Sequence, residues 1–279
     1  MKLLLDETNN AEMLRVIDAQ LESRHWGIMA KGKSPGKKPR YYIFDYRALG
    51  LVTGIIRYYY YREKVNIQLY YRGQKQDWEL RPSLYRRCNN EDDIKRANDW
   101  KTSAIESIKG CFDPAGNEAE REALAQHYGL KTQFFDVVDH IQTALWFACD
   151  ETEKDRGRSR QDEGVGYVEV IAVPMESEII DLRRKPSEWL RPHIQQGFCV
   201  RFPNPDSKLG KLSKYLVMTF IISRQNLRAW SNYDALPHDY FYPNRKLDQG
   251  LVYWENAREK LISDGLLSVD AEGNEKWPV

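Results

Sequence analysis

Residues 65–74 read Val-Asn-Ile-Gln-Leu-Tyr-Tyr-Arg-Gly-Gln. Apolar and polar residues alternate from Val65 to Arg72, which is typical of a β-strand with one buried face. The alternation places Tyr71 on the buried face and Arg72 on the polar face. A guanidinium there offers a planar fork for a phosphate or a carboxylate. Gly73 then allows a ligand or another backbone segment to approach closely.

Helices and strands are both predicted around this stretch. Hydrophobic periodicity and capping residues predict helices at 9–24, 46–63, 94–108, 117–128, 141–153 and 251–263. Strands are predicted at 41–45, 131–137, 165–173 and 215–223, whereas 174–210 is predicted to be irregular. We therefore expect an α+β fold, a single mixed domain over 65–279 with a central sheet flanked by helices. Residues 1–64 are expected to form an N-terminal helical extension with a basic loop.

Composition excludes several classes of protein. The chain has 279 residues, a formal net charge of +1 and 34 aromatic residues, which argues against a disordered chain. No run approaches the roughly 18 apolar residues of a membrane-spanning helix, so we expect a cytoplasmic protein without a membrane partner. The four cysteines are far apart and no metal-binding motif is present, so no metal is expected.

Two further segments carry polar residues near predicted element ends. In residues 122–136, His127 lies at the end of a predicted helix, where the dipole raises the proton affinity of an imidazole. Thr132 and Asp136 follow on a predicted strand, and their even spacing places them on the same face. In residues 191–198, Gln195 and Gln196 precede a glycine and offer amides to a cleft.

Basic residues gather in two places and predict contacts with nucleic acid. Residues 31–40 hold five bases and no acid, and Arg81, Arg86 and Arg87 lie among aromatic residues. Such patterns bind phosphates through charge and bases through stacking. The residues expected to bind nucleic acid are Lys37, Lys38, Arg81, Arg86 and Arg87.

The order of these segments resembles the FRG-domain family, which is named for an aromatic–Arg–Gly motif. That motif is Tyr71-Arg72-Gly73 here, followed by Trp78–Arg86, by Ala125–Asp136 with its His-Tyr-Gly-Leu block, and by Gln195–Phe198. The resemblance covers roughly residues 65–245. Lys131-Thr132-Gln133 departs from the Pro-Thr-Arg usual in the family.

An aromatic–Arg–Gly motif at the end of a first core strand is also similar to the opening motif of arginine-type ADP-ribosyltransferases. This resemblance implies a split β-sheet core and NAD as co-substrate. It implies that Arg72 clamps the NAD phosphate or ribose, that His127 and Thr132 line the nicotinamide side, and that Asp136 stabilises charge on the ribose or makes a structural hydrogen bond. Gln195 or Gln196 would take the third-strand position, with Glu122, Glu169 and Glu176 as alternative carboxylates. The NAD-binding neighbours would be Tyr71, Gly73, Gln74, Tyr128 and Gln195.

Three functions follow as hypotheses. The first is an NAD-dependent ADP-ribosyltransferase acting as an intracellular toxin or phage-defence effector, with RNA or DNA as acceptor and an antitoxin or regulatory protein as partner. The second is a non-catalytic module that binds nucleic acid or a partner protein. The third is a metal-independent nuclease or other hydrolase that uses His127 and Asp136.

Overall fold

The computed structural model describes residues 5–30, 38–150, 164–203, 210–272 and 274–278. The chain divides into two compact units, each assembled from three separate segments. The first unit comprises Met1–Trp78, Val138–Ser177 and Ser213–Pro237, and the second comprises Glu79–Val137, Glu178–Leu212 and His238–Val279. The predicted boundary between residues 64 and 65 therefore lies within the first unit.

The first unit holds five strands of a mixed sheet in the order β1-β2-β8-β5-β3. The strands are β1 (Gly27–Met29), β2 (Arg40–Ile43), β3 (Ile67–Gln74), β5 (Val165–Pro174) and β8 (Leu216–Ser223). Only β2 and β8 pair in parallel among these neighbours, which makes the sheet mixed. The helices of the unit are α1 (Glu7–Arg24), α2 (Arg47–Arg62), α5 (Ile141–Cys149), α7 (Arg224–Ser231) and the short η4 (Ser213–Tyr215).

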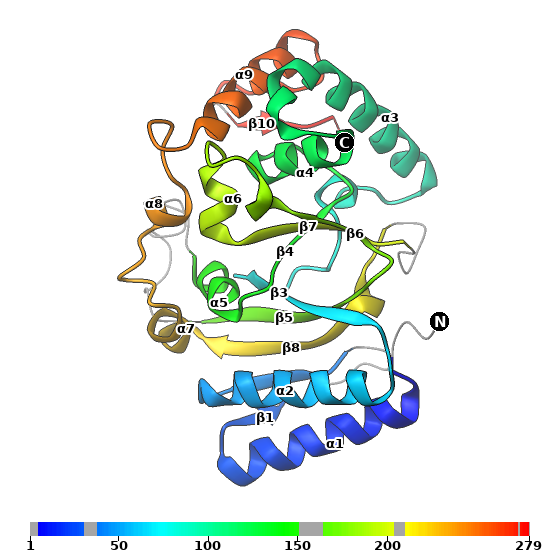
Figure 1. Ribbon diagram of the computed structural model, residues 1–279, viewed down its shortest axis with the longest axis vertical. Helices are drawn as coiled ribbons and strands as arrows, with labels where there is room; N and C mark the ends of the chain where they lie inside the picture. Colours follow the sequence, from blue (N-terminus) through cyan, green and yellow to red (C-terminus); the bar gives the residue numbers. More distant parts are fainter. Residues whose placement is uncertain (1–4, 31–37, 151–163, 204–209, 273, 279) are drawn as a thin grey trace. The chain divides into compact units, whose positions relative to one another are not determined.

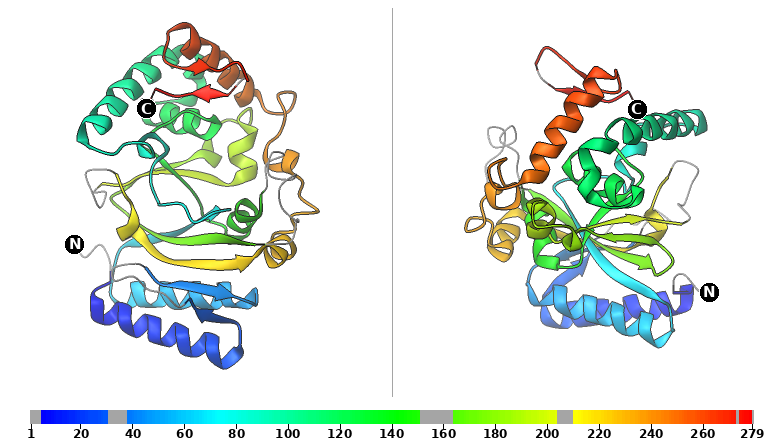
Figure 2. Two further views of the ribbon diagram at one scale, coloured as in Figure 1. Left: turned by 180° about the vertical axis from the view of Figure 1, so that it is seen from behind. Right: turned by 45° about the horizontal axis from the view of Figure 1, so that its top comes forward.

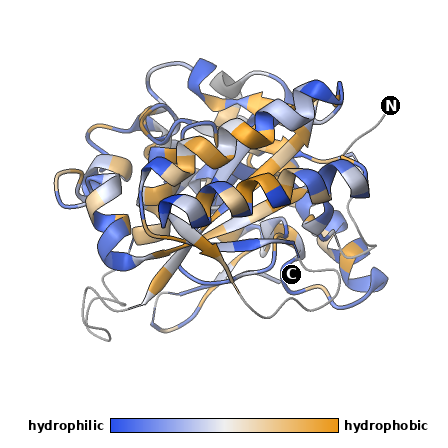
Figure 3. Ribbon diagram, turned by 90° about the horizontal axis from the view of Figure 1, so that it is seen from below, coloured by the Kyte–Doolittle hydropathy of each residue, from blue (hydrophilic) through white to orange (hydrophobic). Residues whose placement is uncertain are grey.

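Strand register and a hydrogen bond place helix α1 on one face of this sheet. Gly73, Val168, Phe220 and Tyr41 are successive register partners and so share a face. Helix α1 reaches this face because the hydroxyl of Tyr41 donates to Asp18 Oδ1 at 2.7 Å. Helices α1 and α2 lie side by side (Figures 1 and 2). Polar and apolar residues alternate along both helices (Figure 3), because each has one buried side.

The second unit is mainly helical. Its longer helices are α3 (Glu91–Ser107), α4 (Glu118–Tyr128) and α9 (Gln249–Ser263), and its short ones are α6 (Leu190–Gln195), α8 (His238–Phe241), η1 (Ser83–Tyr85), η2 (Lys109–Ala115) and η3 (Leu182–Arg184). The strands β4 (Phe135–Val138), β7 (Gly197–Arg201) and β6 (Glu178–Asp181) are adjacent in that order, and β9 (Ser268–Val269) pairs with β10 (Glu275–Lys276). Val138, the last residue of β4, belongs to the first unit.

A continuous aromatic core holds the second unit together. Trp189 and Phe112 are fully buried and stack with ring centroids 5.4 Å apart. The indole nitrogen of Trp100 donates to the carbonyl oxygen of Leu266 at 2.8 Å, which ties α3 to the segment after α9.

The structure confirms the mixed class, with helices flanking a large mixed sheet. It corrects two predicted elements. The segment 174–210 is not irregular, because β6, α6 and β7 lie within it. The predicted strand 131–137 is shorter and later, since β4 begins only at Phe135. Among the described residues, no helix combines the length and the apolar character needed to cross a bilayer.

Candidate functional site

Gly73 allows strand β3 to pack directly against helix α5. A Cβ atom at this position would lie 1.9 Å from the carbonyl oxygen of Ala144 and 2.6 Å from the amide nitrogen of Ala148. Only a residue without a side chain is compatible with such a contact. The glycine of the Tyr-Arg-Gly motif is therefore required for packing, and it fixes the neighbouring residues of β3.

Arg72 points to the opposite face of the sheet, as the alternation predicted. Its register partner on the neighbouring strand is Glu169 of β5, which is 3 % exposed. Burial raises the pKa of the Glu169 carboxyl to about 8, although the Arg72 guanidinium and a hydrogen bond with Gln74 favour the ionised form. One carboxyl oxygen, Oε2, has no hydrogen-bond partner among the described residues. The motif arginine thus lies beside a buried carboxyl group that is mostly protonated at neutral pH.

The polar row continues across the sheet from Glu169. Thr219 of β8 pairs with Glu169, and Arg40 of β2 pairs with Thr219. The guanidinium of Arg40 donates to Asp77 Oδ2 at 2.8 Å, and the Gln74 amide donates to the carbonyl oxygen of Trp78 at 3.3 Å. The turn after β3 therefore folds over this face and holds Gln74 in place.

The His-Tyr-Gly-Leu block forms the end of α4 in the second unit. Asn117 and Glu120 form a capping box at the start of this helix, and Gly129 ends it with φ of 137°. Gly197 leaves room for the His127 ring, since a Cβ there would lie 2.8 Å from Cε1 of the imidazole. This contact between His127 and Gly197 was not predicted from the sequence.

The expected rise in the proton affinity of His127 is wrong. Burial lowers the pKa of the imidazole to about 4, and the charge of Arg191 acts in the same direction, against the opposing effects of Asp136 and Gln195. The Nε2 atom is buried and has no hydrogen-bond partner among the residues that the structure describes. His127 is therefore neutral at physiological pH, because desolvation outweighs the helix dipole.

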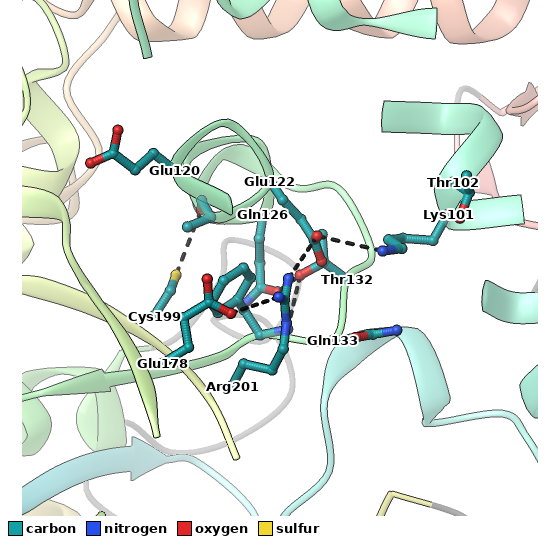
Figure 4. Close-up of polar contacts among 12 residues, drawn as sticks. Lys101, Thr102, Glu120, Glu122, Gln126, Thr132, Gln133, Glu178, Cys199 and Arg201 are labelled. Atoms are coloured by element: carbon teal, nitrogen blue, oxygen red, sulfur yellow. Dashed lines mark hydrogen bonds and ion pairs between the residues drawn. The ribbon is translucent and has the colours of Figure 1, made fainter. Parts of the chain in front are cut away.

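Thr132 and Asp136 come together through a third residue and not on one strand. Gln126 donates from Nε2 to Asp136 Oδ1 at 2.9 Å, and the hydroxyl of Thr132 donates to Gln126 Oε1. Cys199 Sγ lies 3.4 Å from the same Asp136 oxygen. Thr132 is fully buried before β4 begins, so the predicted placement of both residues on one strand face is wrong. Figure 4 shows Thr132 beside Gln126.

Tyr128 and Gln195 are engaged in bonds within the fold. The Tyr128 hydroxyl donates to Asp248 Oδ1 at 2.7 Å, and burial raises the pKa of this phenol. Gln195 is buried and donates to the carbonyl oxygen of Phe241 at 2.7 Å. Gln196 links α6 to β7 with a left-handed backbone, φ of 50°. The structure thus brings His127, Thr132, Asp136 and Gln195 into one cluster in the second unit.

A charged network on the same unit was not predicted. The guanidinium of Arg201 donates to Glu178 at 2.6 Å and to Glu122 at 2.9 Å, and Lys101 Nζ lies 3.5 Å from Glu122 (Figure 4). Glu122 is buried and is paired with two cations, which removes it as a free carboxylate. No local motif marks Arg201, because its partners lie far away in the sequence.

Of the three alternative carboxylates, Glu169 is the register partner of Arg72. Glu176 lies in the first unit but is exposed in the turn after β5. Arg72, Gly73, Gln74 and Tyr71 belong to the first unit, whereas His127, Tyr128, Thr132, Asp136, Gln195 and Gln196 belong to the second. In the described part of the chain, no group of three or more His, Cys, Asp or Glu residues is arranged to hold a metal ion.

The residues predicted to bind nucleic acid are placed differently from one another. Arg86 and Arg87 are exposed, but Arg81 is buried, so its predicted place on a basic surface is wrong. Lys38 Nζ donates a hydrogen bond to the carbonyl oxygen of Lys214 at 3.4 Å. Lys37 lies outside the described residues.

Comparison with known proteins agrees with the motif analysis. No curated protein matches the chain, and no solved structure matches it either. A family model does match, over residues 67–157, and it is that of the FRG domain. The matched range includes the Tyr-Arg-Gly motif of β3, the His-Tyr-Gly-Leu block of α4, and α5. Residues 67–157 of this chain therefore belong to the FRG domain family.

Proposed function

We propose that the protein is an NAD-dependent ADP-ribosyltransferase that uses Arg72 and Glu169 of its first unit. The observation that supports this proposal is their juxtaposition: the two residues are register partners on neighbouring strands, with side chains on one face of the sheet. Arg72 is partly exposed and Glu169 lies buried beside it. A ligand that reaches Arg72 therefore comes close to the carboxyl group.

The chemistry of the two groups suits the two halves of the reaction. The guanidinium of Arg72 binds the NAD pyrophosphate through its planar set of donors. The carboxylate of Glu169 accepts a hydrogen bond from a ribose hydroxyl and stabilises the positive charge that develops on the ribose. The bond from C1′ to the nicotinamide nitrogen breaks, and nicotinamide leaves with the bonding electrons. The acceptor then forms its bond to C1′ and loses a proton to solvent.

In this proposal Glu169 takes the third-strand position that was expected of Gln195 or Gln196. A carboxylate stabilises a cationic ribose better than an amide does, because it carries a full negative charge. Asp136 stays predicted to stabilise charge on the ribose or to make a structural hydrogen bond, and His127 and Thr132 stay predicted for the nicotinamide side. His127 would act there as a neutral ring.

The proposal includes a pH dependence. Since the pKa of Glu169 is about 8 in the absence of ligand, only a minority of molecules hold the carboxylate at neutral pH. Turnover of NAD should therefore increase as the pH rises through 8 and level off about one pH unit higher. In a Glu169→Gln variant this rise should disappear together with most of the activity.

The test is release of nicotinamide from labelled NAD by the full chain, with RNA, single-stranded DNA or cell lysate as acceptor. Arg72→Ala and Glu169→Gln should each reduce release at least tenfold, while Arg57→Ala, an exposed arginine of α2, should not. Thermal unfolding of each variant controls for folding. A well-folded wild-type chain that consumes no NAD in any mixture would refute the proposal. The predicted toxin or defence role would be tested with the same variants in a growth assay.

A further inference from the structure

Four large apolar side chains form a patch on the hairpin of β1 and β2. Ile28 and Tyr42 are register partners, and the Phe44 amide donates to the carbonyl oxygen of Trp26 at 2.8 Å, so the residues form two adjacent cross-strand pairs. Ile28 is 50 % exposed, Tyr42 41 % and Phe44 52 %, while Trp26 is partly buried. We call Trp26, Ile28, Tyr42 and Phe44 the hairpin patch.

The hairpin patch lies on the face of the sheet that α1 does not cover. A Cβ atom on Gly27, between Trp26 and Ile28, would point towards Leu21 of α1 at 3.6 Å. Side chains alternate along a strand, so Trp26 and Ile28 point the other way. Exposed large apolar side chains in adjacent positions mark an interaction site, because isolated soluble domains rarely leave such groups in water.

Two arginine side chains lie over the Trp26 ring of the patch, and a third arginine contacts a tyrosine ring of the neighbouring strand β5. The guanidinium carbons of Arg47 and Arg24 lie 4.6 Å and 5.5 Å from the centre of the Trp26 ring. That of Arg40, two residues before Tyr42, lies 5.4 Å from the ring of Tyr167. Arg47 pairs with Asp45 and Arg40 pairs with Asp77, both in partly exposed ion pairs. Such pairs are weak, so their arginines can exchange a carboxylate for a phosphate at little cost.

The charge around the hairpin favours an anionic partner. The described residues 24–30 and 38–47 contain four lysines and arginines and one acidic residue, in a chain whose formal net charge is +1. Flat aromatic rings beside guanidinium groups stack on unpaired bases, and the arginines contact the phosphates. Bases within a duplex are already stacked on each other and offer only their edges. The pattern therefore favours a single strand over a duplex.

We infer that the hairpin patch binds single-stranded nucleic acid, with bases on Tyr42 and Phe44 and phosphates on Arg24, Arg40 and Arg47. The patch lies on the same face of the sheet as the candidate site, since Tyr42 is in register with Ile221 of β8, which pairs with Tyr167 of β5. Tyr167 in turn pairs with Gln74, the residue two positions after Arg72. Adjacent strands are about 4.8 Å apart, so β2 and β3 are separated by roughly 14 Å. A strand bound at the patch can extend to Arg72.

As an assignment of the acceptor class this inference rests on the proposed function, whereas the binding itself requires no NAD. Fluorescence anisotropy of the full chain without NAD would measure it, using labelled RNA and DNA single strands of about 12 nucleotides and the matching duplexes. We expect saturable binding of the single strands and at least tenfold weaker binding of the duplexes.

The variants separate stacking from charge. Tyr42→Ala and Phe44→Ala should each weaken binding about tenfold, whereas Tyr42→Phe should retain it because the ring remains. Arg40→Gln should lower the slope of log K against log salt by about 0.7, the value for one phosphate contact with a single strand. Tyr61→Ala, at an 86 % exposed tyrosine of α2, is the matched control and should have no effect. Thermal unfolding shows whether each variant folds.

Absence of saturable binding, or binding that Tyr42→Ala and Phe44→Ala leave unchanged in folded protein, would overturn the inference. Concentration-dependent self-association that Phe44→Ala abolishes, without binding of oligonucleotides, would also overturn it and assign the patch to a second copy of the chain. Oligonucleotide binding without NAD turnover would refute the transferase alone. Turnover without oligonucleotide binding would refute the inference alone.

Discussion

At Gly73, a single missing side chain determines whether β3 can contact α5. The ideal Cβ position lies 1.9 Å from the carbonyl oxygen of Ala144, and backbone cannot move aside as a flexible side chain can. Gly73→Ala should therefore destabilise the protein by about 3 kcal/mol or more. Urea unfolding measures this loss.

Gly54→Ala serves as the matched control for that experiment. Gly54 lies within α2 and its Cβ would meet nothing within 4 Å, so alanine there should stabilise the helix by about 1 kcal/mol. If both variants had the same stability as the wild type, this result would contradict the close packing of β3 against α5.

Glu169 should make the stability of the protein depend on pH. Its pKa rises from an ordinary value of 4.5 to about 8 in the folded state, so the folded protein binds a proton that the unfolded chain has lost in this range. The stabilising effect is complete below pH 4.5 and is lost as the pH rises through 8. The free energy of unfolding of the wild type should therefore fall over this window relative to Glu169→Gln.

Urea titrations of both proteins between these pH values would show the difference. Parallel curves across the whole window would mean that the carboxyl group titrates normally. In that case its burial beside Arg72, and the pH profile expected for NAD turnover, would both be wrong.

At the scale of elements, the network around Arg201 ties β7 to α4 and β6. Removing Arg201 would leave the buried carboxylate of Glu122 with Lys101 alone, at 3.5 Å. Arg201→Ala should cost about 3 kcal/mol, because a buried charge that loses a partner is not resolvated. Arg96→Ala, which breaks an exposed pair with Asp93, should cost less than about 1 kcal/mol.

A double variant would identify the cause of that loss. Glu122→Gln combined with Arg201→Met removes the buried charge and should recover most of the stability. If the double variant were no more stable than Arg201→Ala, the contact of the guanidinium with the Phe134 ring, 4.3 Å away, would be the main contribution.

Elements whose own pattern is strong could be predicted from the sequence. Helix α2 keeps its period through the four tyrosines 58–61, and β5 and β8 lie within a residue of the predicted limits. The residues 131–134 were predicted wrongly as strand because the hydrogen bonds of Thr132 go to Gln126 and to residues 83 and 84, not to a ladder. Such long-range partners leave no trace in local periodicity.

The residues of the candidate site also differ in whether they could be predicted from local sequence. The face of the sheet to which Arg72 points could be predicted from alternation alone, because the direction of a side chain along a strand depends only on its position. The pairing of Glu169 with Arg72 depends on the register of two strands almost a hundred residues apart. The lowered pKa of His127 depends on burial, which outweighs the local helix dipole.

At the scale of the whole molecule, the chain passes from one unit to the other five times. The segment that matches the FRG domain model, residues 67–157, contributes β3 and α5 to the first unit and α3 and α4 to the second. A fragment of residues 67–157 should therefore fail to fold, because it lacks the strand partners β5 and β8 and the core helix α9. Circular dichroism and cooperative thermal unfolding of the fragment would test this, and a folded fragment would contradict the division into units.

The position of β8 has a consequence for synthesis of the protein on the ribosome. This strand lies between β2 and β5 in the sheet, yet it ends at residue 223 of 279. The hairpin of β1 and β2 leaves the exit tunnel early and has no neighbouring strand until most of the chain has followed. Its apolar side chains are exposed in the nascent chain throughout that interval, so we expect ribosome-associated chaperones to bind the growing polypeptide.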